Sequence, residues 1–125
     1  MRILTWNING AALLDLKERH PIIKETIEEY QPDILCIQEA FFRQSRKMLE
    51  SIKGYHVSYQ TNFYPLPKII ESTKGGLVTL TREKPVEVNY YPYLAQGNWR
   101  TEQRWDRLLG KGFLETVIEK HNLGK

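Results

Sequence analysis

Two short apolar runs on either side of one helical segment constrain the fold more than any other feature of this sequence. Residues 2–8 are rich in β-forming residues and apolar on both faces, which predicts a strand buried on both sides. Residues 34–37 form a second run of this kind. The segment from His20-Pro21 to Pro32 predicts a helix, because a proline suits a first helical turn and disfavours helix just before it. The apolar stripe of this helix is Ile23, Ile27 and Tyr30. Two strands joined in this way pair in parallel with a right-handed crossover.

The rest of the chain alternates amphipathic and β-rich stretches. Residues 43–53 predict a second helix that ends at Gly54 and whose inward residues are Met48, Leu49 and Ile52. Further strands are expected at residues 55–59, 77–81, 86–91 and 113–119. Loops are expected at 61–74, which contains two prolines, and at 92–111. This order predicts an α/β layered protein with a mixed sheet and flanking helices.

The composition suits one globular domain. Of the 125 residues, 41% are apolar and 26% charged, which argues against a disordered chain. No run approaches the roughly 20 apolar residues that cross a bilayer, and no secretory leader is expected before the first strand. The single Cys36 excludes an intramolecular disulfide framework, so a cytoplasmic protein is expected. The net charge of +3 is too small to identify a nucleic-acid binder.

Polar side chains end both strands of the expected parallel pair. Asn7 ends the first strand, and Gln38-Glu39 follows the second. The carboxyl ends of parallel strands lie at one edge of a sheet, where ligands of open α/β sheets bind, so an amide oxygen and a carboxylate should converge there. Two oxygen donors on rigid strand ends suit Mg²⁺, which takes few protein ligands and polarises phosphoryl oxygens. The residues alone leave an alternative open, in which Asn7 caps a turn and Glu39 is solvated.

Two stretches around these strand ends carry a family resemblance. They are Leu4-Thr5-Trp6-Asn7-Ile8-Asn9-Gly10 and Pro32-Asp33-Ile34-Leu35-Cys36-Ile37-Gln38-Glu39. Together they resemble the opening of the endonuclease/exonuclease/phosphatase (DNase I-like) superfamily, and weaker similarity continues through residues 76–82 and 112–118. The resemblance implies a four-layer α/β sandwich, in which helices flank two packed sheets. It also implies metal-dependent hydrolysis of phosphoester bonds.

The resemblance further implies a role for each residue at the strand ends. Asn7 would be catalytic and orient the phosphate or the attacking water, and Glu39 would bind Mg²⁺ or Mn²⁺. Asn9 and Gln38 would support these two residues structurally. The substrate would be a phosphate ester, with a nucleic acid, a phospholipid head group and an inositol phosphate as the open alternatives.

The chain departs from the family pattern near its end. The family's later motifs are an Asn-Thr-His strand end, an Asp-x-Asn pair and a final Asp-His pair, and the 125 residues contain none of them. Residues 1–125 are therefore expected to be one partial domain, the N-terminal half of such an enzyme, inactive or nearly so alone. The alternative is a non-catalytic module for binding or self-assembly. A homodimer or a C-terminal-half partner would then cover the bare sheet face.

Arginines and aromatic residues are interleaved between residues 90 and 107. Arg100 and Arg104 lie among tyrosines and tryptophans, a combination suited to stacking on bases and gripping phosphates, so both are candidate substrate-binding residues. The alternative is a long loop folded onto the sheet edge, with the arginines in water or paired with Glu102 and Asp106.

Overall fold

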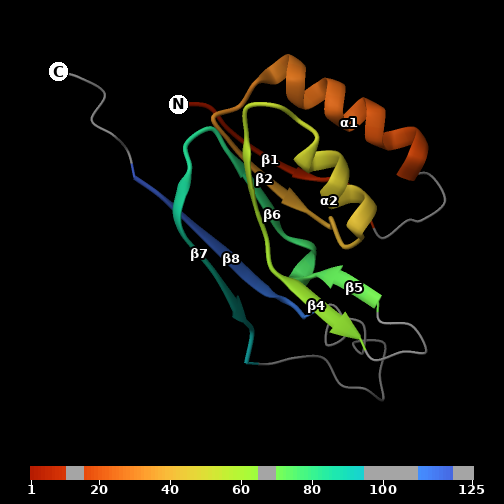
Figure 1. The fold of residues 1–125 in the computed structure, drawn as a ribbon, viewed down its shortest axis with the longest axis vertical. Coiled ribbons are helices and arrows are strands. Elements are labelled where there is room, and N and C mark those ends of the chain that lie inside the picture. The colour runs from red at the N-terminus through yellow and green to blue at the C-terminus, as the bar shows by residue number, and fades with distance from the viewer. Residues whose placement is uncertain (11–15, 65–69, 95–109, 120–125) are drawn as a thin grey trace.

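The computed structural model describes residues 1–10, 16–64, 70–94 and 110–119. Two helices lie on one face of a four-stranded sheet, and two strand pairs accompany it (Figure 1). The helices are α1 (Leu16–Tyr30) and α2 (Arg43–Glu50). The sheet consists, in this order, of β1 (Ile3–Asn7), β2 (Ile34–Gln38), β6 (Val78–Thr81) and β3 (His56–Ser58). The two pairs are β4 (Thr61–Tyr64) with β5 (Ile70–Thr73), and β7 (Pro85–Pro92) with β8 (Gly112–Ile118).

The first strand, helix and strand form the predicted parallel unit. β1 and β2 pair in parallel, and Asn7 lies opposite Gln38. β6 runs antiparallel between β2 and β3, so the sheet is mixed, as predicted. The parallel pairing places the ends of β1 and β2 at the same edge of the sheet. At the opposite edge, the Arg2 carbonyl accepts hydrogen bonds from the Asp33 and Ile34 amides at 2.8 and 3.2 Å.

The core fills the space between the sheet and the two helices. Alternate strand residues point to the helix side, where apolar helix side chains meet them. The largest fully buried members are Ile27, Leu35, Ile37, Leu49, Val78 and Leu80. The two isoleucines of the predicted α1 stripe are buried, whereas Tyr30 is 53% exposed because it is the last residue of the helix. The predicted inward residues of the second helix, Met48, Leu49 and Ile52, all belong to the core.

Helix α1 starts earlier than the sequence predicts. It begins at Leu16, so Pro21 lies inside it and not in its first turn. Proline has no N–H for the carbonyl four residues earlier, here that of Lys17. Both residues are exposed, so water can hydrate the carbonyl that lacks its α-helical partner. The helix ends at Tyr30, shortly before Pro32, as predicted.

The prediction that strand β1 is buried on both sides is wrong, because one face of this edge strand is exposed. Leu4 and Trp6 pack against the core, whereas the alternate residues are exposed, Ile3 to 58%. An apolar run does not distinguish an edge strand from a central one, because the neighbours of a strand come from distant parts of the chain.

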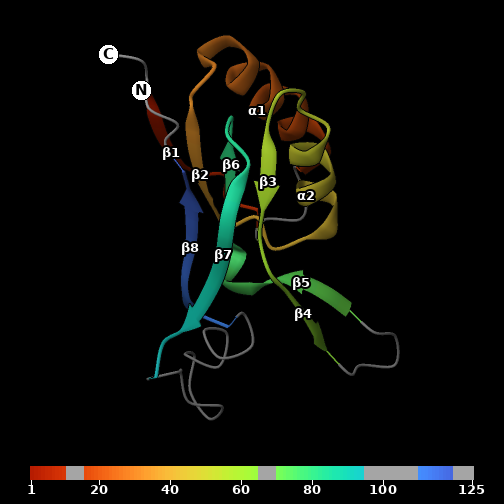
Figure 2. The ribbon, with the colours of Figure 1, turned by 60° about the vertical axis from the view of Figure 1, so that its left-hand side comes forward.

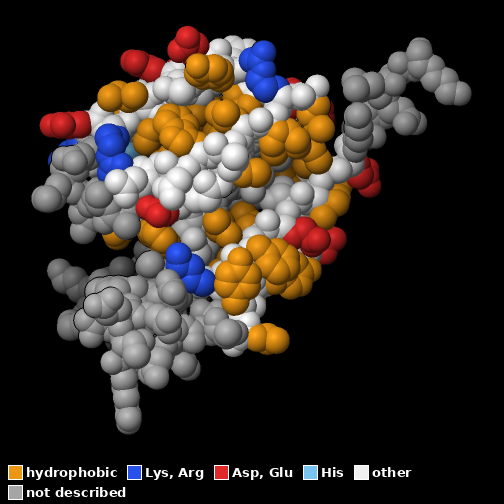
Figure 3. Space-filling model, turned by 180° about the vertical axis from the view of Figure 1, so that it is seen from behind, with side chains coloured by type: hydrophobic (Ala, Val, Ile, Leu, Met, Phe, Trp, Pro, Cys, Tyr) orange, Lys and Arg blue, Asp and Glu red, His pale blue; other side chains and the backbone are white. Residues whose placement is uncertain are grey.

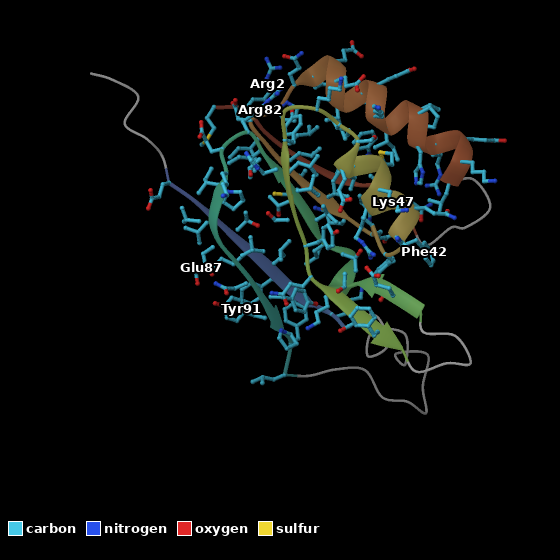
Figure 4. All side chains as sticks on the ribbon, in the orientation of Figure 1. Arg2, Phe42, Lys47, Arg82, Glu87 and Tyr91 are labelled. Carbon is cyan, nitrogen blue, oxygen red and sulfur yellow. The ribbon has the colours of Figure 1, made fainter. Side chains whose placement is uncertain are left out.

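Residues 61–74 contain a hairpin where the sequence predicts a loop. β4 and β5 pair antiparallel, with Thr61 opposite Thr73. The two prolines of this stretch fall in the connection at 65–69, outside the described residues, so they do not interrupt the pairing. A β-bridge between Phe42 and Ser72 joins β5 to the segment before α2. Phe42 is labelled in Figure 4.

The β7–β8 pair lies over the sheet face that the helices leave open (Figure 2). β7 contacts β3, and β8 contacts β6. The side chains buried on this face of the sheet carry hydroxyl groups and are Ser58, Thr79 and Thr81. The described residues therefore form a mixed α/β structure with a second small sheet packed on the first. This arrangement agrees with the predicted half of a DNase I-like sandwich, but the sheet face expected to be bare is partly covered by the β7–β8 pair.

The outer face of the β7–β8 pair carries exposed aromatic rings. Tyr91 and Phe113 stack there with ring centroids 4.9 Å apart. Acidic side chains lie beside hydrophobic ones on this part of the surface (Figure 3). The candidate substrate-binding residues Arg100 and Arg104 follow β7 and lie outside the described residues. Neither described helix is long and apolar enough to span a membrane.

Candidate functional site

Asn7 and Glu39 meet at the sheet edge where β1 and β2 end. The Nδ2 group of Asn7 donates a hydrogen bond of 3.0 Å to Oε1 of Glu39. The strand pairing continues one step further, because the Ile8 amide donates to the Gln38 carbonyl at 3.1 Å. Glu39 then adopts a left-handed φ of 62°, which turns the chain away from the strand. The two side chains therefore meet as expected, but the amide turns its nitrogen and not its oxygen toward Glu39, so the expected pair of oxygen donors is not formed.

The orientation of the Asn7 amide is fixed by its two partners. Its Oδ1 accepts a 2.8 Å hydrogen bond from the backbone N–H of Asn9, so the donor atom Nδ2 faces Glu39. Asn9 has a left-handed φ of 51°, which asparagine tolerates. Gly10 follows so close to Glu39 that a Cβ would lie 2.0 Å from the Glu39 carbonyl oxygen. Asn7 thus caps the turn, as in the alternative that the residues leave open, and it also contacts the carboxylate of Glu39.

Gln38 ties the two strands together and makes no hydrogen bond to Glu39. Its Nε2 donates to the Thr5 hydroxyl at 2.7 Å and to the Cys36 carbonyl at 3.3 Å. These bonds fasten the end of β2 to β1 on the open sheet face. Burial raises the pKa of the Cys36 thiol, which disfavours the reactive thiolate. The geometry therefore suits a supporting role for Gln38 and gives Cys36 no nucleophilic one.

Sequence reasoning misses Arg19 of α1, which belongs to the same edge. Its guanidinium donates to the Ile8 carbonyl at 2.8 Å and to the Asn9 carbonyl at 3.1 Å. It therefore holds the turn after β1 against the beginning of the helix. Only the early start of α1 at Leu16 brings this residue here, and the proline inside the helix hides that start in the sequence.

The surface beside Asn7 is hollowed. A hollow of about 240 Å³ adjoins Asn7 between β1 and α1. Its lining residues are Trp6, Asn7, Ile8, Asn9, Arg19, Ile22 and Ile23. A larger hollow of about 500 Å³ lies between β3 and β7 and includes neither Asn7 nor Glu39. Glu39 is half-buried and lines neither of these two hollows.

The donor set at this edge fits a hard divalent cation that is bound mostly through water. Glu39 engages Asn7 through Oε1, and within the described part of the chain its Oε2 accepts no hydrogen bond. Mg²⁺ often takes only one or two carboxylates and keeps several waters, so one available carboxylate oxygen is compatible with it. Residues 1–10, 16–64, 70–94 and 110–119 contain no group of three or more His, Cys, Asp and Glu side chains placed to hold a metal ion.

Comparison with known proteins gives the family. The profile of the Endonuclease/Exonuclease/phosphatase family matches residues 4–114, and the chain belongs to this family of phosphoesterases. The chain is also similar to nocturnin from Rattus norvegicus, Mus musculus and Homo sapiens. The identity is 34% over 83 residues, a match that covers 54% of this chain and 18% of each nocturnin.

Two solved structures share the fold. An endonuclease/exonuclease/phosphatase family protein from Leptotrichia buccalis aligns with a TM-score of 0.64 at 18% identity, over 97% of this chain and 49% of that one. Humanized D. rerio TDP2 with 14 mutations aligns with a TM-score of 0.56 at 17% identity, over 72% of this chain and 36% of its own. The chain thus spans about half the length of the first structure.

Proposed function

We propose that this chain contributes Asn7 and Glu39 to the active site of a phosphoester hydrolase that depends on Mg²⁺ or Mn²⁺. The hydrogen bond between the two side chains carries the proposal. It holds a carboxylate with one available oxygen at the edge where open α/β sheets bind their ligands. Membership of a phosphoesterase family supports the reaction class.

Each residue of the site has a task in this proposal. Glu39 would hold the metal ion, and Asn7 would keep the carboxylate in place. When bound, such an ion neutralises charge on phosphate oxygens and activates water. Nδ2 of Asn7 has a second N–H, which is suited to a phosphate oxygen or to the attacking water. Asn9 and Arg19 hold the turn that carries Asn7.

The proposed substrate is a phosphate ester drawn from nucleic acids, phospholipid head groups or inositol phosphates. We keep Arg100 and Arg104 as proposed contacts to its phosphates. The described residues contribute one carboxylate to the site and no histidine near it. The chain alone should therefore hydrolyse little or no substrate, because none of the described residues at this edge is suited to deprotonate the attacking water.

Metal binding is testable on the chain itself, without turnover. Mn²⁺ added to the ¹⁵N-labelled chain should broaden the backbone NMR signals of Asn7 and Glu39 before others, because the ion is paramagnetic. Glu39→Gln should abolish this selectivity. Glu29→Gln is the matched control, since Glu29 is exposed near the end of α1, at the opposite edge of the sheet. Broadening that survives Glu39→Gln would refute Glu39 as the ligand.

Hydrolysis provides the second test. With Mg²⁺ and bis-p-nitrophenyl phosphate, the chain should release product at the background rate. Mg²⁺-dependent turnover that disappears in Glu39→Ala would overturn the expected inactivity while supporting the assignment of Glu39. Turnover that persists in Glu39→Ala would refute both.

A second candidate function is self-assembly, which exposed apolar residues favour. Ile3 on the edge strand β1 and the Tyr91–Phe113 stack on the β7–β8 pair are exposed. Edge strands with apolar side chains pair readily with other chains. Sedimentation of the purified chain should then show a dimer or a larger species, and a monodisperse monomer would exclude this function.

A further inference from the structure

The residues that follow Glu39 are fastened to β5 and to the short turn Lys74–Gly76. The Ala40 amide donates to the Gly76 carbonyl at 2.8 Å, and the Thr73 amide donates to the Phe41 carbonyl at 2.9 Å. Both bonds lie within two residues of Glu39. The position of the Glu39 backbone therefore depends on where β5 and the turn lie.

The turn at Gly76 lies so close to Phe41 that it leaves no room for a side chain. Gly76 has a left-handed φ of 67°, and a Cβ on it would lie 2.7 Å from the ring of Phe41. Phe41 is itself buried. Glu39 also has a left-handed φ, of 62°, which is uncommon for a residue other than glycine. Such a conformation persists only where the surroundings hold it.

Arg46 on α2 holds β5 in place. Its side chain is buried, yet it carries a charge, which is costly unless partners surround it. Nη1 donates to the Thr73 hydroxyl at 3.0 Å, and Nη2 forms an ion pair with the Glu71 carboxylate. The Tyr59 ring lies against the guanidinium, 5.1 Å from centroid to Cζ. Glu71 and Thr73 are both residues of β5, so Arg46 binds this strand to α2.

Thr73 connects the two sets of bonds. Its hydroxyl accepts from Arg46, and its backbone N–H donates to Phe41, two residues after Glu39. We propose that Arg46 and Thr73 are positioning residues that act on Glu39 through this connection. The role of Glu39 as metal ligand rests on the proposed function, whereas the connection itself is a property of the chain. Without it, β5 shifts, the Phe41 segment loosens and Glu39 leaves the geometry in which it meets Asn7.

The test compares two substitutions at Thr73. Thr73→Val keeps the shape and removes the hydroxyl, so Arg46 loses one of its two acceptors on β5, whereas Thr73→Ser keeps the hydroxyl. The first readout is the pair of side-chain amide NMR signals of Asn7, which report its bond to Glu39. The second is the Mn²⁺ concentration that broadens the Glu39 signal. Thr73→Val should move the Asn7 signals and weaken Mn²⁺ binding about tenfold, the lower end for residues that orient a metal ligand. Thr73→Ser should resemble the wild type in both.

A control separates positioning from general loss of stability. Ser45 neighbours Arg46 on α2 and is fully buried, but its hydroxyl pairs with His20 Nε2 of α1 at 3.2 Å. Ser45→Ala should lower the urea midpoint without moving the Asn7 signals or the Mn²⁺ concentration. If Ser45→Ala moves them as much as Thr73→Val does, the effect is a general loss of packing and the proposal is overturned.

The remaining outcomes also decide the question. Wild-type Asn7 signals and Mn²⁺ binding in a folded Thr73→Val chain would overturn the proposal. If Thr73→Val does not fold, Glu71→Gln is used instead. Glu71 is less buried than Arg46, and glutamine keeps its shape but removes the charge that pairs with Arg46. If the wild type shows no selective Mn²⁺ broadening, the proposed function fails, while the Asn7 signals still decide whether Thr73 positions Glu39.

Discussion

Asn7 and Glu39 are 32 residues apart in the chain, and a 3.0 Å hydrogen bond joins their side chains. The register of β1 and β2 makes this possible, because Asn7 lies opposite Gln38, the residue before Glu39. A slip of one residue would turn the Asn7 side chain to the other face of the sheet. The contact between Asn7 and Glu39 therefore depends on the register of β1 and β2.

Asn7→Ala should destabilise the chain and disturb Glu39. It removes two exposed hydrogen bonds, so the free energy of unfolding should fall by about 1 kcal/mol, measured by urea denaturation. The selective Mn²⁺ broadening at Glu39 should weaken as well. Asn89→Ala is the control. Asn89 lies on β7, away from the site, and its amide also donates two hydrogen bonds, to the carboxylates of Glu87 at 2.6 Å and Glu115 at 3.1 Å. If Mn²⁺ broadens the Glu39 signal equally in both variants and in the wild type, Asn7 does not hold the Glu39 carboxylate in place.

Leu35→Ala should be among the most destabilising substitutions in the chain. Leu35 is fully buried between the helices and the sheet, so its loss removes apolar contacts and leaves a cavity. The expected loss is about 2–5 kcal/mol in the free energy of unfolding. Leu94→Ala should change it by less than about 0.5 kcal/mol, since Leu94 is fully exposed. Equal effects in urea denaturation would contradict the observed core.

Gly76→Ala should cost more stability than Gly54→Ala. Both glycines have a left-handed φ, at 67° and 85°, so alanine is strained at either by about 1 kcal/mol. A Cβ at Gly76 also meets the buried Phe41 ring, which adds about 1–3 kcal/mol of overpacking. A Cβ at Gly54 meets only the end of the flexible Arg82 side chain. Thermal unfolding of both variants checks the order, and a smaller loss for Gly76→Ala would contradict the close contact with Phe41.

Stability should fall as the pH drops below about 6.5, because of His20. Burial, and secondarily the nearby charge of Arg19, lowers the pKa of His20 from its ordinary value of 6.5. As the pH falls, the unfolded chain binds a proton at His20 before the folded chain does. His20 therefore costs no stability above its unfolded pKa. The free energy of unfolding decreases as the pH falls below that pKa, and the loss is complete below the folded pKa.

Urea midpoints measured across this pH range check the prediction. His20→Gln should flatten the fall, whereas His56→Gln, a substitution at an exposed histidine of β3, should leave it in place. A fall of the same size in His20→Gln would assign the pH dependence to other groups.

The sequence predicts best those helices and strands that local patterns of residues define. The parallel unit, the stripe of α2 and the late strands all appear near their predicted places, because periodicity and turn residues act over a few positions. The β4–β5 hairpin is missed because Pro65 and Pro67 indicate a loop, although both lie between the two strands and not within them. The early start of α1 is missed because Pro21 resembles a first-turn proline.

The candidate site divides in the same way. The convergence of Asn7 and Glu39 follows from two strand ends and one parallel connection, which the sequence is sufficient to predict. Arg19 joins the site only because α1 packs over the end of β1. The bond from Arg46 to Thr73 spans 27 residues and depends on how α2 meets β5.

The sequence by itself therefore determined the family motifs, the order of elements and the residues at the ends of β1 and β2. Only the tertiary structure decided that β1 is an edge strand, and that Arg19 and Arg46 hold the turn and the segment on which Asn7 and Glu39 depend. The physical reason is range. Hydrophobic period, turn residues and helix ends are set by neighbours in the chain, whereas strand order and the partners of a buried charge are set by residues that only folding brings together.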